Sequence, residues 1–102
     1  MLEIRPTCEN CNKFLPPSST DAMICSYECT FCSNCVAKII ENVCPNCGGG
    51  FCQRPVRPIE NLKGGNYLGI DPASTVIIHK PVDKVVHNAF AEKIKYIASY
   101  ER

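Results

Sequence analysis

Eight of the nine cysteines are spaced as metal ligands. They form four close pairs: Cys8-x2-Cys11, Cys25-x3-Cys29, Cys32-x2-Cys35 and Cys44-x2-Cys47. Two intervening residues let a tight turn point two sulfurs at one ion about 2.3 Å away, while backbone amides of the turn donate hydrogen bonds to those sulfurs. Gly48 suits such a turn because a glycine takes positive φ without steric cost. The spacing therefore predicts eight ligands for two metal ions, and zinc is the expected metal.

The spacing allows two ways of sharing the ions. In an interleaved arrangement Cys8, Cys11, Cys32 and Cys35 hold one ion, and Cys25, Cys29, Cys44 and Cys47 hold the other. A sequential arrangement assigns the first four cysteines to one ion and the next four to the other, as in two successive ribbons or treble clefs. The run CSYECTFCSNC followed by CPNC favours the interleaved arrangement because it resembles the RING finger, which has an aromatic residue just before its fifth ligand. Phe31 has that place here, and Cys29 stands where most RING fingers have histidine.

The sequence predicts no catalytic residue. Four cysteines around each ion close its coordination sphere and leave no position for an activated water. His79 and His87 have no acidic or nucleophilic partner at a recognisable spacing, so we interpret both as surface or half-buried side chains. Cys52 has no partner at knuckle spacing and is interpreted as a free thiol. CPNCG also resembles a rubredoxin knuckle, which leaves iron as an alternative metal, although rubredoxin needs only four cysteines.

Length and composition favour a small metal-stabilised protein of the cytoplasm. A chain of 102 residues can bury only a modest core, so it needs metal or disulfide support. The opening MLEIRPTCEN is not an export signal, and no run of about 18 apolar residues could span a bilayer. In a reducing compartment the thiols remain available to metal. We therefore expect a cytoplasmic, metal-binding chain outside the membrane.

The charge pattern argues against general nucleic-acid binding. The formal net charge of +1 treats cysteines as neutral. Eight thiolates and two Zn²⁺ ions add −8 + 4 = −4, which gives about −3. Arg54 and Arg57 in RPVRP are weak evidence for a nucleic-acid-binding surface, because no aromatic platform or basic helix accompanies them. Residues 1–52 carry a net negative charge and residues 53–102 a net positive charge, so we expect the two halves to attract each other. Because nucleic-acid binding is disfavoured, we expect the partner to be a protein.

The elements that position the cysteines are expected to form an α+β fold: a RING-like or treble-clef module with a short hairpin and a helix, followed by a C-terminal amphipathic helix. Strands are predicted at 21–25 and 29–32, and a helix at 33–43 with Ser33 as its N-cap. Residues 1–52 form the zinc module. Residues 53–82 form an extended strap with a helical turn at 70–75 and a strand at 76–79. Residues 83–102 form a helix that starts at Asp83, with an apolar stripe of Val86, Phe90, Ile94 and Ile97.

The blocks MLEIRPTCENC, ICSYECTFCSNCV, CPNCGG followed by RPVRP, and DPAST together resemble the bacterial domain-of-unknown-function family 1272, over about residues 1–81. The resemblance implies zinc-type ligands and a bacterial cytoplasmic origin, with no established reaction or partner. We therefore expect a noncatalytic zinc module with a structural or protein-interaction role. One alternative is a RING-like ubiquitin-ligase adaptor, which Glu9, Asn10 and the absence of tryptophan disfavour. Another is a thiol-based redox or metal sensor in which Cys52 begins the exchange.

Overall fold

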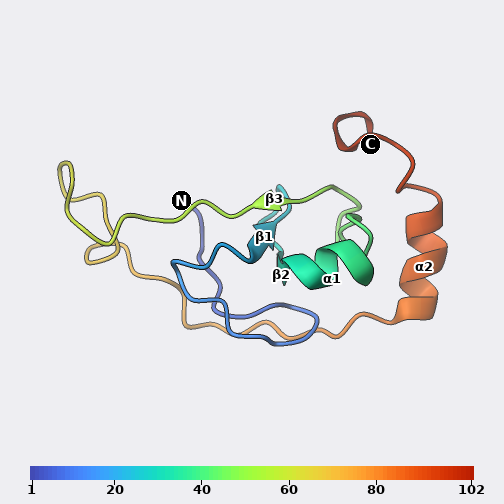
Figure 1. Ribbon diagram of the computed structural model, residues 1–102, viewed down its shortest axis with the longest axis horizontal. Helices are drawn as coiled ribbons and strands as arrows, with labels where there is room; N and C mark the ends of the chain where they lie inside the picture. Colours follow the sequence, from blue (N-terminus) through green and yellow to red (C-terminus); the bar gives the residue numbers. More distant parts are fainter.

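A three-stranded antiparallel sheet and one short helix form the centre of the protein. The computed structural model describes residues 1–102. Strands β1 (Ala22–Ile24) and β2 (Thr30–Cys32) form a hairpin that leads directly into α1 (Ser33–Lys38). Strand β3 (Cys52–Gln53) then pairs with the other edge of β1, giving the order β2-β1-β3 (Figure 1). The predicted α+β class is confirmed.

The hairpin lies where the sequence predicts it, with shorter strands. Met23 pairs with Phe31, and Ile24 pairs with Thr30. Strand β3 is an addition, because two residues are too few to show the period-2 pattern by which strands are recognised. Around the sheet lies a small apolar core in which the cysteines themselves take part; its largest fully buried apolar side chains are Phe31, Ile4, Leu15, Ile40 and Val43.

Helix α1 is shorter than predicted, and its N-cap lies one residue before the predicted cap, Ser33. Its N-cap is Cys32, and the helix ends at Lys38 instead of residue 43. Glu41 and Asn42 have φ angles of 52° and 57°, which a right-handed helix cannot contain. These two residues turn the chain back toward the sheet. Periodicity could not reveal that turn, because neither residue is a glycine.

Residues 54–83 contain no helix and no strand, so the predicted helical turn at 70–75 and strand at 76–79 are wrong. The segment runs away from the sheet, turns in a loop near residues 60–70 and returns beneath the N-terminal segment (Figure 1). On the way back it makes single backbone hydrogen bonds, from Ser74 N to Ile4 O at 2.9 Å and from Lys80 N to Glu9 O at 2.8 Å. Isolated bonds of this kind fasten an extended chain without making a β ladder.

Helix α2 (Lys84–Glu92) starts as predicted and ends early. Oδ1 of its N-cap, Asp83, accepts from Val85 N and Val86 N at 3.0 and 3.2 Å. After Glu92 the chain continues in turns and a short 3-10 helix, η1 (Ser99–Glu101). The predicted stripe is only partly correct, since Val86 is 67% exposed and Ile97 is 41% exposed.

The residues that α2 buries are His87 and Ala91. The interpretation of His87 as a surface or half-buried side chain is therefore wrong, because it is only 3% exposed. Its Nε2 donates to Ile40 O at 3.0 Å, just beyond the end of α1. A carbonyl left free near a helix end supplies the partner that a buried imidazole needs.

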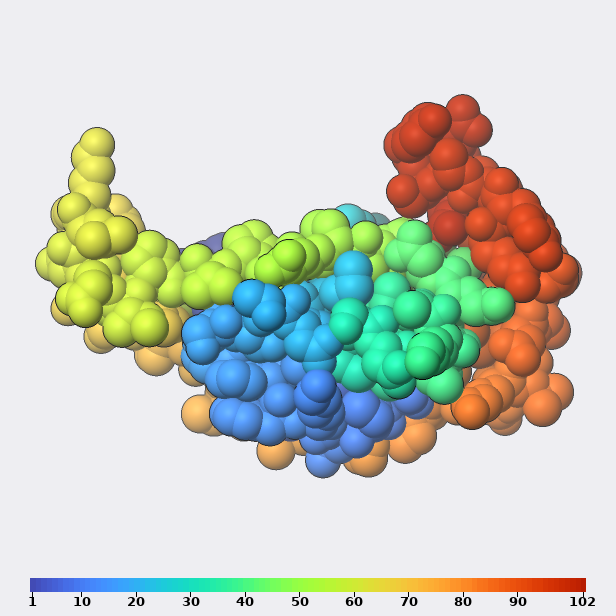
Figure 2. Space-filling view, in the orientation of Figure 1, coloured from blue at the N-terminus to red at the C-terminus, as the bar shows by residue number.

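The molecule is elongated, with principal extents of 46, 27 and 18 Å. Its radius of gyration of 14.6 Å exceeds the value of about 13 Å expected for a compact chain of this length. The loop at residues 60–70 and helix α2 lie at opposite ends of the long axis, with the cysteine-rich segments between them (Figure 2). No helix combines the length and apolar character needed to cross a membrane.

Candidate metal centres

The two Cys-x2-Cys turns at residues 8–11 and 44–47 have the same backbone geometry, and we call them the first and second knuckles. In each, the amide of the first cysteine donates five residues ahead, and its carbonyl accepts from the residue just after the second cysteine. The four bonds are Cys8 N to Lys13 O, Asn12 N to Cys8 O, Cys44 N to Gly49 O and Gly48 N to Cys44 O, all between 2.8 and 2.9 Å. The residue after the second cysteine has positive φ in both, 62° at Asn12 and 79° at Gly48, as predicted for the glycine.

The first cluster joins the first knuckle to the start of α1. The sulfurs of Cys8, Cys11, Cys32 and Cys35 all lie within 4.8 Å of one another. Cys11 Sγ is 3.8 Å from Cys32 Sγ. Four sulfurs placed tetrahedrally about 2.3 Å from a central Zn²⁺ would be about 3.8 Å apart. The donor set and its spacing therefore fit a metal ion bound by four thiolates.

The second cluster joins the hairpin turn to the second knuckle. Cys25, Cys44 and Cys47 have sulfurs within 4.8 Å of one another. The fourth predicted ligand, Cys29, does not meet that mutual distance, although it is buried beside the group and its sulfur accepts from Asn46 Nδ2 at 3.4 Å. Backbone amides also donate to sulfur here, from Asn46 N to Cys44 and from Gly49 N to Cys47, both at 3.4 Å.

The β1–β2 hairpin explains why the sulfurs group in the interleaved way. Its turn, between Ile24 and Thr30, carries Cys25 and Cys29 toward the second knuckle. Its other end carries Cys32 toward the first knuckle, and α1 adds Cys35 one turn later. Strand β2 has three residues, about 10 Å of extended chain, which separates the two clusters. The sequential grouping does not occur, because neighbouring cysteine pairs lie at opposite ends of one hairpin.

Burial makes these thiols poor acids without a cation. Desolvation is the largest cause that raises the pKa of the Cys29, Cys32, Cys35 and Cys44 thiols. Partly opposing it, Asn46 donates to Cys29 and Asn10 donates to Cys35, and both bonds favour the thiolate. A divalent cation at each cluster would supply the charge that keeps four neighbouring sulfurs deprotonated.

Two asparagines emerge as site residues that the sequence interpretation missed. Asn10 Nδ2 donates to Cys35 Sγ at 3.3 Å in the first cluster, as Asn46 Nδ2 does to Cys29 in the second. Each stands third in its knuckle, so the repeated pattern Cys-x-Asn-Cys was the available signal. Such bonds to metal-binding sulfur orient the ligand.

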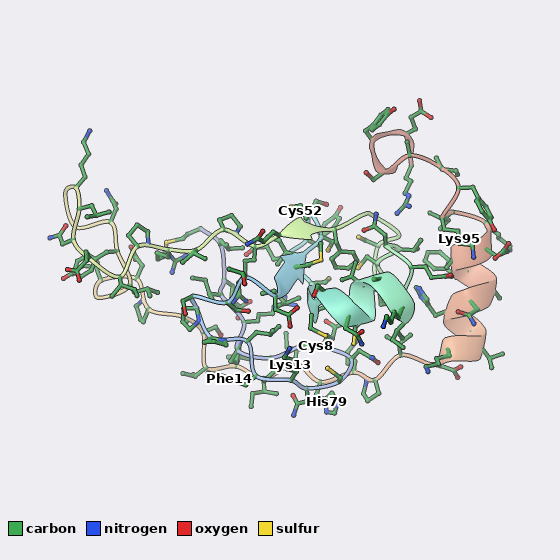
Figure 3. The ribbon with its side chains drawn as sticks, viewed as in Figure 1. Cys8, Lys13, Phe14, Cys52, His79 and Lys95 are labelled. Carbon is green, nitrogen blue, oxygen red and sulfur yellow. The ribbon has the colours of Figure 1, made fainter.

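The remaining candidates lie outside both clusters. Cys52 is exposed on β3, consistent with a free thiol (Figure 3). His79 Nε2 donates to Asn10 O at 3.1 Å. Arg54 and Arg57, the basic residues of RPVRP, donate to backbone carbonyls instead of facing solvent as a pair.

Comparison with known proteins agrees with the resemblance. The profile of a family described as protein of unknown function (DUF1272) matches residues 1–57, which include all eight predicted ligands. The chain belongs to the DUF1272 family. It is also 52% identical over 81 residues to an uncharacterised protein of Rhizobium meliloti (strain 1021), covering 79% of this chain and 89% of the relative. No solved structure matches this DUF1272 protein. The comparisons thus establish the family, while the clusters supply the chemistry.

Proposed function

We propose that this protein binds two zinc ions, one at each cluster, and that the ions stabilise a noncatalytic module which interacts with another protein. The observation that carries the proposal is the first cluster, in which four cysteine sulfurs have the mutual spacing of a tetrahedral metal site. The second cluster adds three grouped sulfurs with Cys29 beside them. We assign Cys25, Cys29, Cys44 and Cys47 as its ligands.

A structural role for the metal follows from the size of the core. Only 20 of the 102 residues are buried, and six of these are cysteines of the two clusters. Such a core leaves much of the folding free energy to be supplied by cross-links between segments. An ion bound by four thiolates joins a knuckle to the hairpin at each cluster, and its binding free energy becomes folding free energy. With all four positions filled by sulfur, the ion has no open position for hydrolytic chemistry.

A protein partner fits the surface better than nucleic acid does. Arg54 is 1% exposed, and the Arg57 guanidinium donates to Asp71 O and Leu2 O at 2.7 and 2.8 Å. Neither guanidinium is free to contact phosphates. Apolar side chains are exposed instead along α2 and the residues after it, including Val85, Val86 and Tyr96. Large exposed apolar side chains of this kind are typical of protein contact surfaces.

The ubiquitin-ligase adaptor has less support than the simpler module. Pro45 of CPNC, the one residue that resembles a contact residue of RING ligases, lines a pocket of about 350 Å³. The strap and α2 line the same pocket through Pro81, Val82 and Phe90. A carrier enzyme would have to share that surface with the strap and α2.

Metal content decides the proposal. Native mass spectrometry and elemental analysis of protein purified under reducing conditions are expected to find two zinc ions per chain. Cys32→Ser should retain fewer than two ions, whereas Cys52→Ser, which removes the exposed ninth cysteine, should retain both. Iron in the purified protein, or two ions still bound to Cys32→Ser, would reject the assignment.

A further inference from the structure

Cys29 differs from the other predicted ligands of the second cluster in the position of its sulfur. It follows Glu28, whose φ is 65°, in the one cysteine pair with three intervening residues. Its sulfur lies outside the mutual 4.8 Å distance of the other three in the second cluster. The side-chain donor that contacts it is Asn46 Nδ2, at 3.4 Å. The position of the fourth sulfur therefore depends on how the Asn46 amide is held.

Three partners fix the Asn46 amide in one orientation. Its Nδ2 donates to Glu9 Oε2 at 2.8 Å as well as to Cys29 Sγ, and its Oδ1 accepts from Lys80 Nζ at 3.1 Å. A carboxylate and a thiolate only accept, and an ammonium only donates. A flipped amide would place its oxygen against both acceptors and its NH₂ against the ammonium. The side chain therefore presents a donor to Cys29 in the only orientation that satisfies all its partners.

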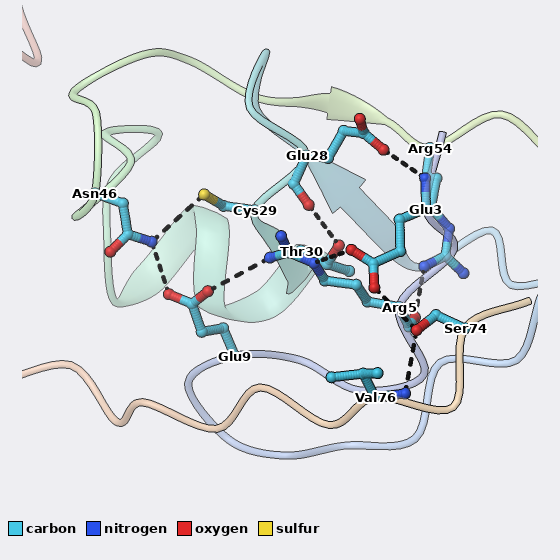
Figure 4. Close-up of polar contacts among 10 residues, drawn as sticks. All are labelled: Glu3, Arg5, Glu9, Glu28, Cys29, Thr30, Asn46, Arg54, Ser74 and Val76. Carbon is cyan, nitrogen blue, oxygen red and sulfur yellow. Dashed lines mark hydrogen bonds and ion pairs between the residues drawn. The ribbon is translucent and has the colours of Figure 1, made fainter. Parts of the chain in front are cut away.

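Glu9 connects this amide to the first cluster. It lies between Cys8 and Cys11 in the first knuckle and is 3% exposed. Figure 4 shows its carboxylate beside the Asn46 amide, which also contacts Cys29. Its backbone amide donates to Thr30 O at 2.9 Å, which ties the knuckle to β2. Arg5 Nη1 lies 3.8 Å from Oε1 and supplies a positive charge on the other side of the carboxylate. A buried carboxylate with these few partners is placed by the fold of its knuckle, and that knuckle is completed by metal.

We propose that Glu9 and Asn46 are positioning residues that couple the two metal clusters. Metal in the first cluster sets the first knuckle and so places Glu9. Glu9 then orients Asn46, and Asn46 holds Cys29 where the second ion can bind it. The ion at the second cluster, which we call the second ion, is consequently bound more weakly when either side chain is removed. The ion at the first cluster, the first ion, keeps its affinity. This inference rests on the proposed function, since it requires two metal sites.

Cobalt(II) titration of the metal-free, reduced full-length chain tests the coupling. The intensity of thiolate-to-cobalt charge-transfer absorption reports how many sulfurs bind each ion. An overall loss of folding stability would not remove one sulfur from the second ion alone. The wild type is expected to bind two ions with four sulfurs each. In Asn46→Ala and Asn46→Asp the second ion should bind roughly 10- to 100-fold more weakly. Its charge-transfer intensity should fall by about a quarter, from four sulfurs to three.

Glu9→Ala should weaken the second ion in the same way, and Glu9→Gln should restore it, because the glutamine oxygen still accepts from Asn46. Asn34→Ala is the matched control, since Asn34 has the same place in Cys32-Ser33-Asn34-Cys35 but is exposed and makes no side-chain hydrogen bond. Normal binding of the first ion in each variant serves as the check on folding.

The outcomes separate the two proposals. If Asn46→Asp and Glu9→Ala bind the second ion as tightly as Asn34→Ala does, with four sulfurs, the coupling is rejected and the two-zinc proposal stands. If both ions weaken equally in these variants, the side chains are general structural residues and the coupling is again rejected. If the wild type itself fails to bind two thiolate-coordinated ions, the proposed function falls and the coupling falls with it.

Discussion

Arg54 shows how a single charged residue can serve as an internal clamp. It is 1% exposed and has no carboxylate partner. Its Nη1 donates to Arg5 O at 2.9 Å, and its Nη2 donates to Pro16 O at 3.1 Å and Leu15 O at 3.5 Å. Burial lowers the pKa of this guanidinium, which nevertheless stays protonated as arginine does in proteins. The donors of the guanidinium thus join the residue after β3 to two segments outside the helices and strands.

Removing this clamp should destabilise the protein without changing its metal content. Arg54→Met keeps much of the apolar stem but leaves the carbonyls of Arg5, Leu15 and Pro16 without their donor, and we expect a loss of about 3 kcal/mol in the free energy of unfolding. Urea denaturation of the zinc-loaded chain at fixed free zinc would measure it. Lys63→Met, in the exposed distal loop, is the control and should change stability by less than about 0.5 kcal/mol. Equal stability of the two variants would show that the carbonyls find other donors.

Two aspartates with similar local sequences have different roles in the elements. Asp71 lies in the predicted helical turn at 70–75, and Asp83 lies at the predicted start of the C-terminal helix, but only Asp83 caps a helix. Asp71 is followed by Pro72, but no helix begins there. Hydrogen bonds to the N-terminal segment hold the returning strap extended. An aspartate in a capping position was therefore not enough to start a helix, and tertiary contacts decided where one formed.

This difference gives a test at helix α2. Asp83→Ala removes the acceptor for Val85 N and Val86 N, and loss of an N-cap costs about 1 kcal/mol. Amide hydrogen exchange in residues 84–92 should therefore become about fivefold faster in the zinc-loaded protein. Asp71→Ala should leave exchange in α2 unchanged. If both variants behave alike, the aspartate at residue 83 does not cap the helix.

The features that the sequence could predict are those that depend on residues close together along the chain. Cysteine pairs predicted the knuckles, the short runs at 21–25 and 29–32 predicted the hairpin, and Asp83 predicted the start of α2. The ends of both helices could not be predicted, because they are set by contacts with distant segments and by positive φ at Glu41 and Asn42. The roles of Glu9 and Asn46 could not be predicted either, since they arise only when the two knuckles meet in space.

The whole molecule is organised around the two clusters, because the second half is fastened to both knuckles. Asn10 Oδ1 accepts from Val82 N at 2.8 Å, and Asn46 Oδ1 accepts from Lys80 Nζ. Each of these asparagines also donates to a cluster sulfur. Farther along, Arg102 Nη1 donates to Gly48 O at 3.1 Å, behind the second knuckle. Lys95 Nζ also lies 3.3 Å from Glu41 Oε2, so a basic side chain of the second half contacts an acidic one of the first half, as the charge pattern predicts.

Removing metal should therefore release the C-terminal half as well as unfold the first. Without ions the knuckles lose their cross-links, and the contacts at Asn10, Asn46 and Gly48 lose the surfaces that hold them. Chelation is expected to lower the circular dichroism signal and to abolish amide protection across residues 1–52 and in α2 together, and two equivalents of Zn²⁺ should restore both. The metal-loaded chain with the same salt concentration is the control.

A division between the two halves would contradict this expectation. The α2 segment has only nine residues, and helices of that length are marginal when isolated in water. If α2 kept its protection after chelation while residues 1–52 lost theirs, the strap and helix would have to be stabilised by something other than the knuckles. If neither segment lost protection, the apolar core around Phe31 would suffice to hold the fold, and the metal would not be structural.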